Sequence, residues 1–121
     1  MGARIESQSG KPPLTIHGSA DVKPIDYTLP IASAQVKSAI LFAGLSANGR
    51  TQVRESALSR DHTERMFNGF GVKVTIDEAL TVTLDGPAQL IGGEMTVPGD
   101  ASSAAYFVAA AMLLDGSELS I

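Results

Sequence analysis

The sequence has no cysteine among its 121 residues. This absence excludes disulfide bonds, thiolate nucleophiles and cysteine-ligated metal sites, and it favours a cytoplasmic location over secretion. No uncharged apolar run reaches the length of a membrane span, and the first residues lack the apolar core of a signal peptide. We therefore expect a soluble, cytoplasmic protein that has no membrane as its partner.

Positive charge is also scarce. Nine Lys and Arg residues stand against 13 Asp and Glu residues, which gives a net charge of -4. Proteins that bind nucleic acids usually show a clustered basic excess, so we expect no nucleic-acid partner. Any anion must be held locally, by a few groups. The 44% hydrophobic residues supply enough apolar surface for the core of one modest domain.

Apolar periodicity divides the chain into alternating strands and helices. The expected helices cover residues 36–45 with Ser33 as N-cap, 59–71 with Ser59 at the start, and 101–114 with Asp100 as cap. The expected strands cover residues 14–17, 51–55, 72–76, 80–84 and 94–97, and another begins at 119. This order is typical of an α/β fold with helices on one face of a sheet. The last strand, which has only begun, suggests a fragment.

The three expected helix starts share one design: a break, a small polar or acidic residue, and then an apolar helix. They lie at residues 33–35, 59–61 and 100–103. The first turn of a helix presents unpaired N–H groups and a partial positive charge, so it can bind a phosphate even in an acidic protein. Ser33, Ser59 and Asp100 can also be simple caps, and capping and ligand binding can coexist.

Two side chains near these starts have chemistry that suits a ligand. Gln35 can donate and accept hydrogen bonds at once, which fits a polyol beside an anion, although a surface glutamine looks the same in sequence. Arg60 offers a planar, permanently charged fork to a phosphate. Its alternative role is an ion pair with Asp61, Glu64 or Glu55.

The sequence gives no indication of a metal or a cofactor. His17 and His62 are the two histidines, and no His, Asp or Glu spacing around them resembles a zinc site. A phosphate-binding P-loop, a dinucleotide glycine fingerprint and a nucleophile elbow are also missing. We therefore expect none of these cofactor or nucleophile chemistries.

Residues 30–45, with the sequence PIASAQVKSAILFAGL, resemble the segment of 5-enolpyruvylshikimate-3-phosphate (EPSP) synthases that meets shikimate 3-phosphate. Further stretches similar to the family are SRDHTERM at 59–66, VPGDASSAAYF at 97–107 and LTIHG at 14–18. Together they span nearly the whole chain. The Ser-Ala-Gln form, followed by Arg-Asp-His-Thr-Glu, most resembles the branch called class II, which tends to tolerate glyphosate.

The resemblance implies a function and a set of site residues. Enzymes of this family transfer the enolpyruvyl group of phosphoenolpyruvate to the 5-hydroxyl of shikimate 3-phosphate, in the shikimate pathway to aromatic amino acids. By resemblance, Ser33 and the backbone of Ala34 contact the phosphate of shikimate 3-phosphate. Gln35 touches both substrates, and Arg60 adds charge on the phosphate side. Ser59 and Asp100 are further candidates, and no catalytic residue is assigned within the segment.

The resemblance also implies a fold. Family members have two similar domains, each built from three βαβαββ units in an inside-out α/β barrel. We expect residues 1–97 to be part of one domain, about one unit with flanking strands, and residues 98–121 to start the other domain after the crossover. Apolar surface that neighbouring units would cover leads us to expect self-association of the isolated chain, which light scattering can test.

Alternative functions remain open at this point. UDP-N-acetylglucosamine enolpyruvyl transferases share the fold and the chemistry, although their sequence at the first helix differs. A noncatalytic anion-binding or structural fragment is another alternative, and an unrelated helical interaction domain is a third. Titration with shikimate 3-phosphate while following backbone amides would separate a binding segment from an inert one.

We expect this chain alone to have no measurable synthase activity. The basic residues near the family's N-terminus, its Arg-Pro arginine and its C-terminal acid and basic cluster have no counterpart among these residues. Charge that develops in the transition state would therefore lack its opposing donors. A steady-state phosphate-release assay on the purified chain should give the rate of the blank, and turnover that requires both substrates would contradict this expectation.

Overall fold

The computed structural model describes all residues from 1 to 121 and contains both strands and helices. In chain order the elements are β1 (Arg4–Gln8), β2 (Lys11–His17), β3 (Asp26–Thr28), α1 (Ala34–Gly44), β4 (Gly49–Arg54), α2 (His62–Gly69), β5 (Val74–Ile76), β6 (Thr81–Gly86) and α3 (Ala101–Leu113). None of the helices is long and apolar enough to cross a membrane.

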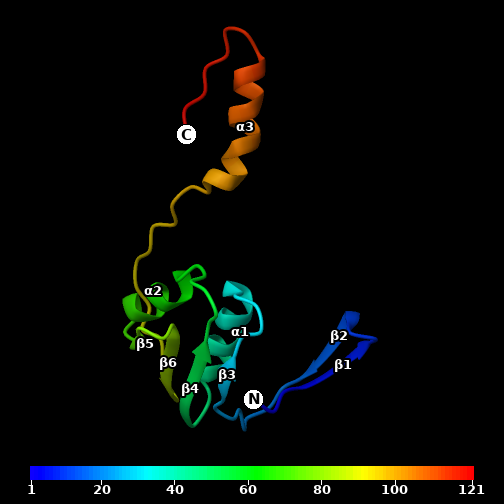
Figure 1. Cartoon of the computed structure of the whole chain (residues 1–121), viewed down its shortest axis with the longest axis vertical. Coiled ribbons are helices and arrows are strands. Elements are labelled where there is room, and N and C mark those ends of the chain that lie inside the picture. Colours follow the sequence, from blue (N-terminus) through cyan, green and yellow to red (C-terminus); the bar gives the residue numbers. More distant parts are fainter.

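The middle of the chain forms a four-stranded sheet in the order β3-β4-β6-β5 (Figure 1). Strands β3 and β4 are parallel and are joined through α1, whereas β6 is antiparallel to both β4 and β5. Helix α2 connects β4 to β5. This part of the chain is therefore a βαβαββ unit, and the α/β class expected from the sequence is confirmed.

Helices α1 and α2 cover the same face of this sheet. One core cluster of six buried residues joins both helices to β5, β6 and the short segment between α2 and β5: Leu41, Phe67, Val72, Val74, Val82 and Leu84. The ring of Phe42 on α1 meets that of Phe67 on α2 edge to face, with 5.0 Å between the centroids, a favoured aromatic geometry. Shared burial therefore fixes the two helices relative to each other.

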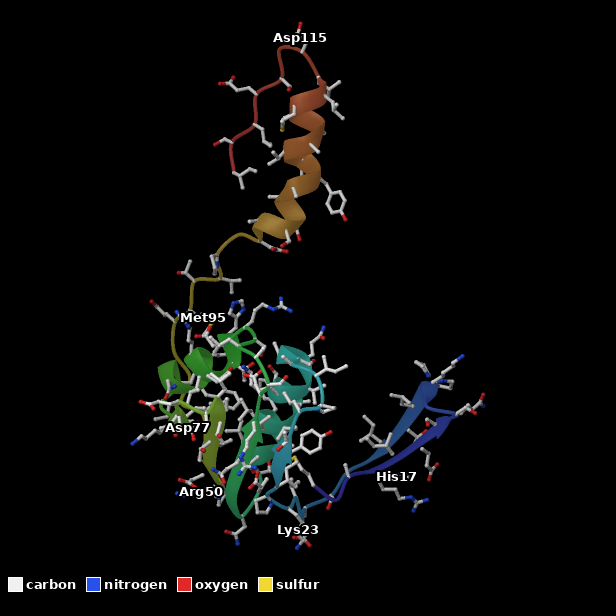
Figure 2. The ribbon with its side chains drawn as sticks, in the orientation of Figure 1. His17, Lys23, Arg50, Asp77, Met95 and Asp115 are labelled. Atoms are coloured by element: carbon white, nitrogen blue, oxygen red, sulfur yellow. The ribbon has the colours of Figure 1, made fainter.

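The opposite face of the sheet is polar, because side chains of a strand point alternately to its two faces. Arg54 of β4 donates to both carboxylate oxygens of Asp26 on β3, and Arg50 of β4 pairs with Asp85 on β6. Arg50 lies at the end of the sheet where β4 begins (Figure 2). The alternation of polar and apolar residues made β4 and β6 predictable, whereas β3 was not predicted.

Two parts of the chain stand apart from the βαβαββ unit. The β1–β2 hairpin extends from one side, and every residue of its strands is exposed (Figure 1). Helix α3 lies beyond the extended residues that follow β6, and none of its residues is buried. Its predicted cap is confirmed, because Asp100 Oδ1 accepts a hydrogen bond of 2.9 Å from the Ser102 N–H.

Some expectations were wrong. Residues 94–97 and 119–121 are not strands, because neither segment meets a neighbouring strand that could take up its backbone hydrogen bonds. The second helix begins at His62 and not at Ser59. Strands β1 and β3 were not predicted. Strand β1 pairs with β2 around a turn in which Ser9 and Gly10 have positive φ angles.

Gly86 provides a test of how closely the sheet meets the turn after α1. A Cβ atom at this position would lie 2.3 Å from the Gly44 carbonyl oxygen and 2.4 Å from that of Ala47. Because both are backbone atoms, the turn would have to shift. We expect Gly86→Ala to lower the free energy of unfolding by about 2–3 kcal/mol in a urea titration followed by circular dichroism.

Gly92→Ala is the matched control, since nothing lies within 4 Å of a Cβ atom there and its φ is not positive. It should change the free energy of unfolding by less than about 0.5 kcal/mol. Equal effects of the two substitutions would show that the turn does not pack on β6 as described.

Candidate anion-binding site

The site lies at the carboxyl ends of the two parallel strands. The Leu29 N–H, just after β3, donates a hydrogen bond of 2.9 Å to the carbonyl oxygen of Arg54, the last residue of β4. From this shared edge the chain runs on one side to the start of α1 and on the other side to the start of α2. Parallel pairing therefore brings residues 33–35 and 59–60 to one place in the fold.

The first turn of α1 has unsatisfied backbone donors. Ser33 is the N-cap, as predicted, and its Oγ accepts a long hydrogen bond of 3.4 Å from the Val36 N–H. The N–H groups of Ala34 and Gln35 donate to no acceptor within the chain. Free N–H groups at a helix start, together with the helix dipole, favour an anion at this position.

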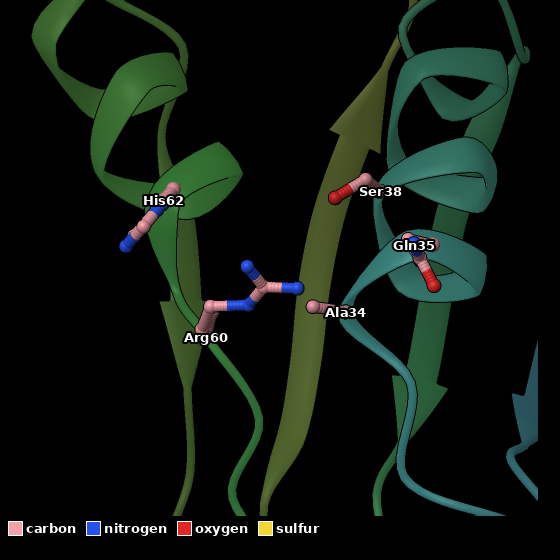
Figure 3. A pocket seen from close by; sticks show the side chains of 5 residues that line it. All are labelled: Ala34, Gln35, Ser38, Arg60 and His62. Atoms are coloured by element: carbon pink, nitrogen blue, oxygen red, sulfur yellow. The ribbon is translucent and has the colours of Figure 1, made fainter. Parts of the chain in front are cut away.

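Two adjoining hollows lie over this helix start. One, of about 370 Å³, is lined by Ala34, Gln35, Ser38, Arg60 and His62 (Figure 3). The other, of about 400 Å³, is lined by Ala32, Ser33, Ala34, Gln35, Leu58, Ser59 and Arg60. The structure thus brings together every candidate residue except Asp100. That residue caps α3 and lines neither hollow.

Arg60 is exposed and makes no ion pair or hydrogen bond within the chain. Its guanidinium extends from the segment before α2 toward Ala34 at the start of α1 (Figure 3). The alternative of an ion pair with a neighbouring acid is wrong. Asp61 accepts a hydrogen bond of 2.7 Å from Arg65 Nε, which lowers the pKa of the Asp61 carboxyl. Glu55 and Glu64 pair with Lys37.

Lys37, two residues after Gln35 on α1, is 1% exposed. Its Nζ donates to Glu55 Oε2 at 2.7 Å and lies 2.6 Å from Glu64 Oε1. Burial alone would lower the pKa of the ammonium, but the hydrogen bond to Glu55 and the close contact with Glu64 outweigh it, and the pKa is raised. The lysine is therefore a charged group held inside the protein.

The same cluster connects three parts of the fold. Glu55 directly follows β4, Glu64 lies in the first turn of α2, and Lys37 lies in α1. The hydroxyl of Ser59 donates to the other carboxylate oxygen of Glu55, which explains why Ser59 does not cap α2. A hydrogen bond of 2.6 Å between the hydroxyls of Ser38 and Thr63 adds a second link between the helices.

Sequence reasoning missed Lys37, although a signal was present. Lys37, Ile40, Leu41 and Gly44 occupy one stripe of α1, and all four are buried. A lysine in the first turn of a helix opposes the helix dipole, so a lysine on a buried stripe there requires acidic partners. The partners follow much later in the chain and could not be identified from local spacing. Ser38 and His62 were also missed as lining residues of the site.

The sequence and the fold of the chain are similar to those of known proteins. A family model described as EPSP synthase (3-phosphoshikimate 1-carboxyvinyltransferase) matches residues 1–121. The chain is 56% identical over 124 residues to the 3-phosphoshikimate 1-carboxyvinyltransferase of Akkermansia muciniphila, and the match covers 100% of this chain and 28% of the relative. It is 57% identical over 122 residues to the enzyme of that name from Synechocystis, with 98% and 27% covered.

A solved structure of EPSP synthase from Acinetobacter baumannii superposes with a TM-score of 0.77 at 48% identity. The match covers 92% of this chain and 25% of that structure. The chain thus spans a little over a quarter of the length of the curated relatives that it matches.

Replacement of Lys37 by Met tests the buried cluster. The variant keeps most of the side-chain volume but leaves two buried carboxyl groups without their cation. We expect the free energy of unfolding to fall by about 3–5 kcal/mol in urea titrations. The control is Asp85→Asn, which removes the carboxylate from an exposed ion pair with Arg50 and should leave stability almost unchanged. A Lys37→Met variant as stable as the parent chain would contradict the burial of this charge.

Proposed function

Because the chain belongs to the EPSP synthase family, we propose that it supplies the wall of an enolpyruvyl transferase that binds the phosphate of shikimate 3-phosphate. Its fold is an α/β fold and a part of the fold of these enzymes. The proposed reaction of the whole protein is transfer of the enolpyruvyl group from phosphoenolpyruvate to the 5-hydroxyl of shikimate 3-phosphate, in the shikimate pathway. Both substrates are multiply charged metabolites, which fits a cytoplasmic location.

One observation carries this proposal: the N–H groups at the start of α1 and the unpaired guanidinium of Arg60 meet at the same hollows. A phosphate group needs several donors that converge from different directions. Backbone N–H groups supply them along the helix axis, and a guanidinium supplies a charged pair of donors from the side. The two sets together can hold a phosphate although the protein is acidic overall.

The other lining residues have supporting roles in the proposal. The Ser33 hydroxyl, which makes only one long bond as a cap, can donate to a phosphate oxygen. The exposed Gln35 lines both hollows, so its amide can reach shikimate 3-phosphate on one side and phosphoenolpyruvate on the other. The hydrogen bond from the Ser59 hydroxyl to Glu55 holds the segment that carries Arg60. We assign binding and orientation to these residues, and no catalytic step.

The domain division is also part of the proposal. Residues 1–97 would belong to one domain of the whole enzyme and residues 98–121 to the start of the other. In support, no helix or strand lies between β6 and α3, and α3 contributes no buried residue. The exposed Tyr106, Phe107 and Met112 on α3 support the related prediction that the isolated chain self-associates.

Titration of the 15N-labelled chain with shikimate 3-phosphate tests the proposed site. We expect the amide signals of Ser33, Ala34, Gln35 and Arg60 to move in fast or intermediate exchange. Arg60→Gln should weaken binding roughly tenfold or more, because it removes charge-assisted hydrogen bonds. Arg50→Gln is the matched control, since this exposed arginine lies at the opposite end of β4, and it should bind as the parent chain does.

Shikimate without its phosphate serves as the ligand control and should cause much smaller shifts. Equal weakening by the two arginine substitutions would indicate nonspecific attraction of an anion. Shifts confined to other parts of the chain, or no shifts at all, would refute the assignment of these residues to the substrate.

A further inference from the structure

Arg60 lies among acidic side chains and yet pairs with none of them. Glu55, Asp61 and Glu64 all belong to the short segment between the end of β4 and the first turn of α2. Ser59, the residue before Arg60, is bonded to Glu55, and Asp61, the residue after it, is bonded to Arg65. An arginine side chain is long enough to fold back to a carboxylate that its neighbour contacts. The lack of an ion pair at the Arg60 guanidinium therefore needs an explanation.

The buried Lys37 provides that explanation. Its Nζ contacts one oxygen of Glu55 at 2.7 Å and one oxygen of Glu64 at 2.6 Å. Glu64 Oε2 is also buried and accepts no hydrogen bond, so this carboxyl group depends on Lys37 for its compensation. Without the ammonium, Glu55 and Glu64 would face the interior with no cation, and Arg60 is the nearest unpaired cation in the chain sequence.

We propose that Lys37 is a positioning residue for anion binding: by holding Glu55 and Glu64, it keeps the guanidinium of Arg60 available to a phosphate in the hollow. The inference rests on the proposed function, because it names what prepares the same site. Lys37 itself lines neither hollow and touches no ligand in this scheme. Its effect on binding passes through the charge of its two partners and the orientation of Arg60.

This role differs in its consequences from simple support of the fold. If Lys37 acted only as a structural link between α1, β4 and α2, its loss would loosen the link without bringing a carboxylate to Arg60, and the guanidinium would stay free. If Lys37 instead keeps the two acids away from Arg60, then neutralising the acids should restore binding even though the lysine is missing. The state of the Arg60 guanidinium in Lys37→Met, together with rescue by charge removal at the partners, therefore separates the two roles.

The experiment compares three forms of the full 121-residue chain: the parent, Lys37→Met, and the triple variant Lys37→Met with Glu55→Gln and Glu64→Gln. Shikimate 3-phosphate is the probe, followed through the amide signals of Ala34 and Gln35. We expect Lys37→Met to weaken binding roughly tenfold or more, and the triple variant to return to within about threefold of the parent. Circular dichroism establishes that each form is folded.

A second readout needs no ligand. The Nε–Hε signal of Arg60, assigned by its loss in Arg60→Lys, reports whether the guanidinium is free. It should move and exchange more slowly with water in Lys37→Met, as expected when it pairs with a carboxylate, and should return to its original position in the triple variant. If Lys37→Met does not fold, Lys37→Met with Glu55→Gln replaces it and should show the same change through Glu64 alone.

The outcomes distinguish failure of the proposed function from failure of the inference about Lys37. A folded triple variant that binds as weakly as Lys37→Met would overturn the inference in favour of a structural role, as would a Lys37→Met variant that binds like the parent. If the parent chain does not bind shikimate 3-phosphate, the proposed function fails by itself. The Arg60 signal still decides the inference in that case, because an unchanged signal in the Lys37 variants would overturn it.

Discussion

The buried contact of Lys37 with Glu55 and Glu64 is the interaction on which the geometry of the site depends. It joins the first turn of α1, the residue that follows β4 and the first turn of α2. The hollows are lined by the start of α1 and by the chain between β4 and the start of α2. A buried ion pair contributes little net stability compared with apolar side chains, but it is costly to break. Such a contact favours one relative position of the two helix starts over others that apolar packing alone would allow.

The sheet places these parts close enough for that contact to form. Parallel pairing of β3 with β4 brings the segments after both strands to the same edge, and the shared core under α1 and α2 holds both helices on one face. The ion pairs of the strands lie on the other face, so the charges near the hollows come from the loops and helix starts. The sheet and its two helices therefore follow from the local pattern of polar and apolar residues. The contact of Lys37 with Glu55 and Glu64 forms only through the tertiary structure.

The sequence was sufficient to predict the elements of the βαβαββ unit except its first strand, β3, together with the cap at Ser33 and the convergence of residues 33–35 with Arg60. Apolar period, capping residues and family resemblance are all local signals. The sequence was not sufficient for Ser59 or Lys37. Ser59 looks like a helix cap, but its hydroxyl is bonded to Glu55 instead. Lys37 looks like a surface residue until its stripe on α1 is seen to be buried. Residues 94–97 have the composition of a strand but meet no partner strand, which propensity cannot reveal.

The most direct test of this account is a crystal structure of the chain with bound shikimate 3-phosphate. The account predicts the phosphate at the start of α1, bonded to the N–H groups of Ala34 and Gln35 and to the guanidinium of Arg60, with Lys37 still between Glu55 and Glu64. A phosphate bound elsewhere, or an Arg60 side chain paired with either glutamate while the start of α1 stays empty, would contradict it.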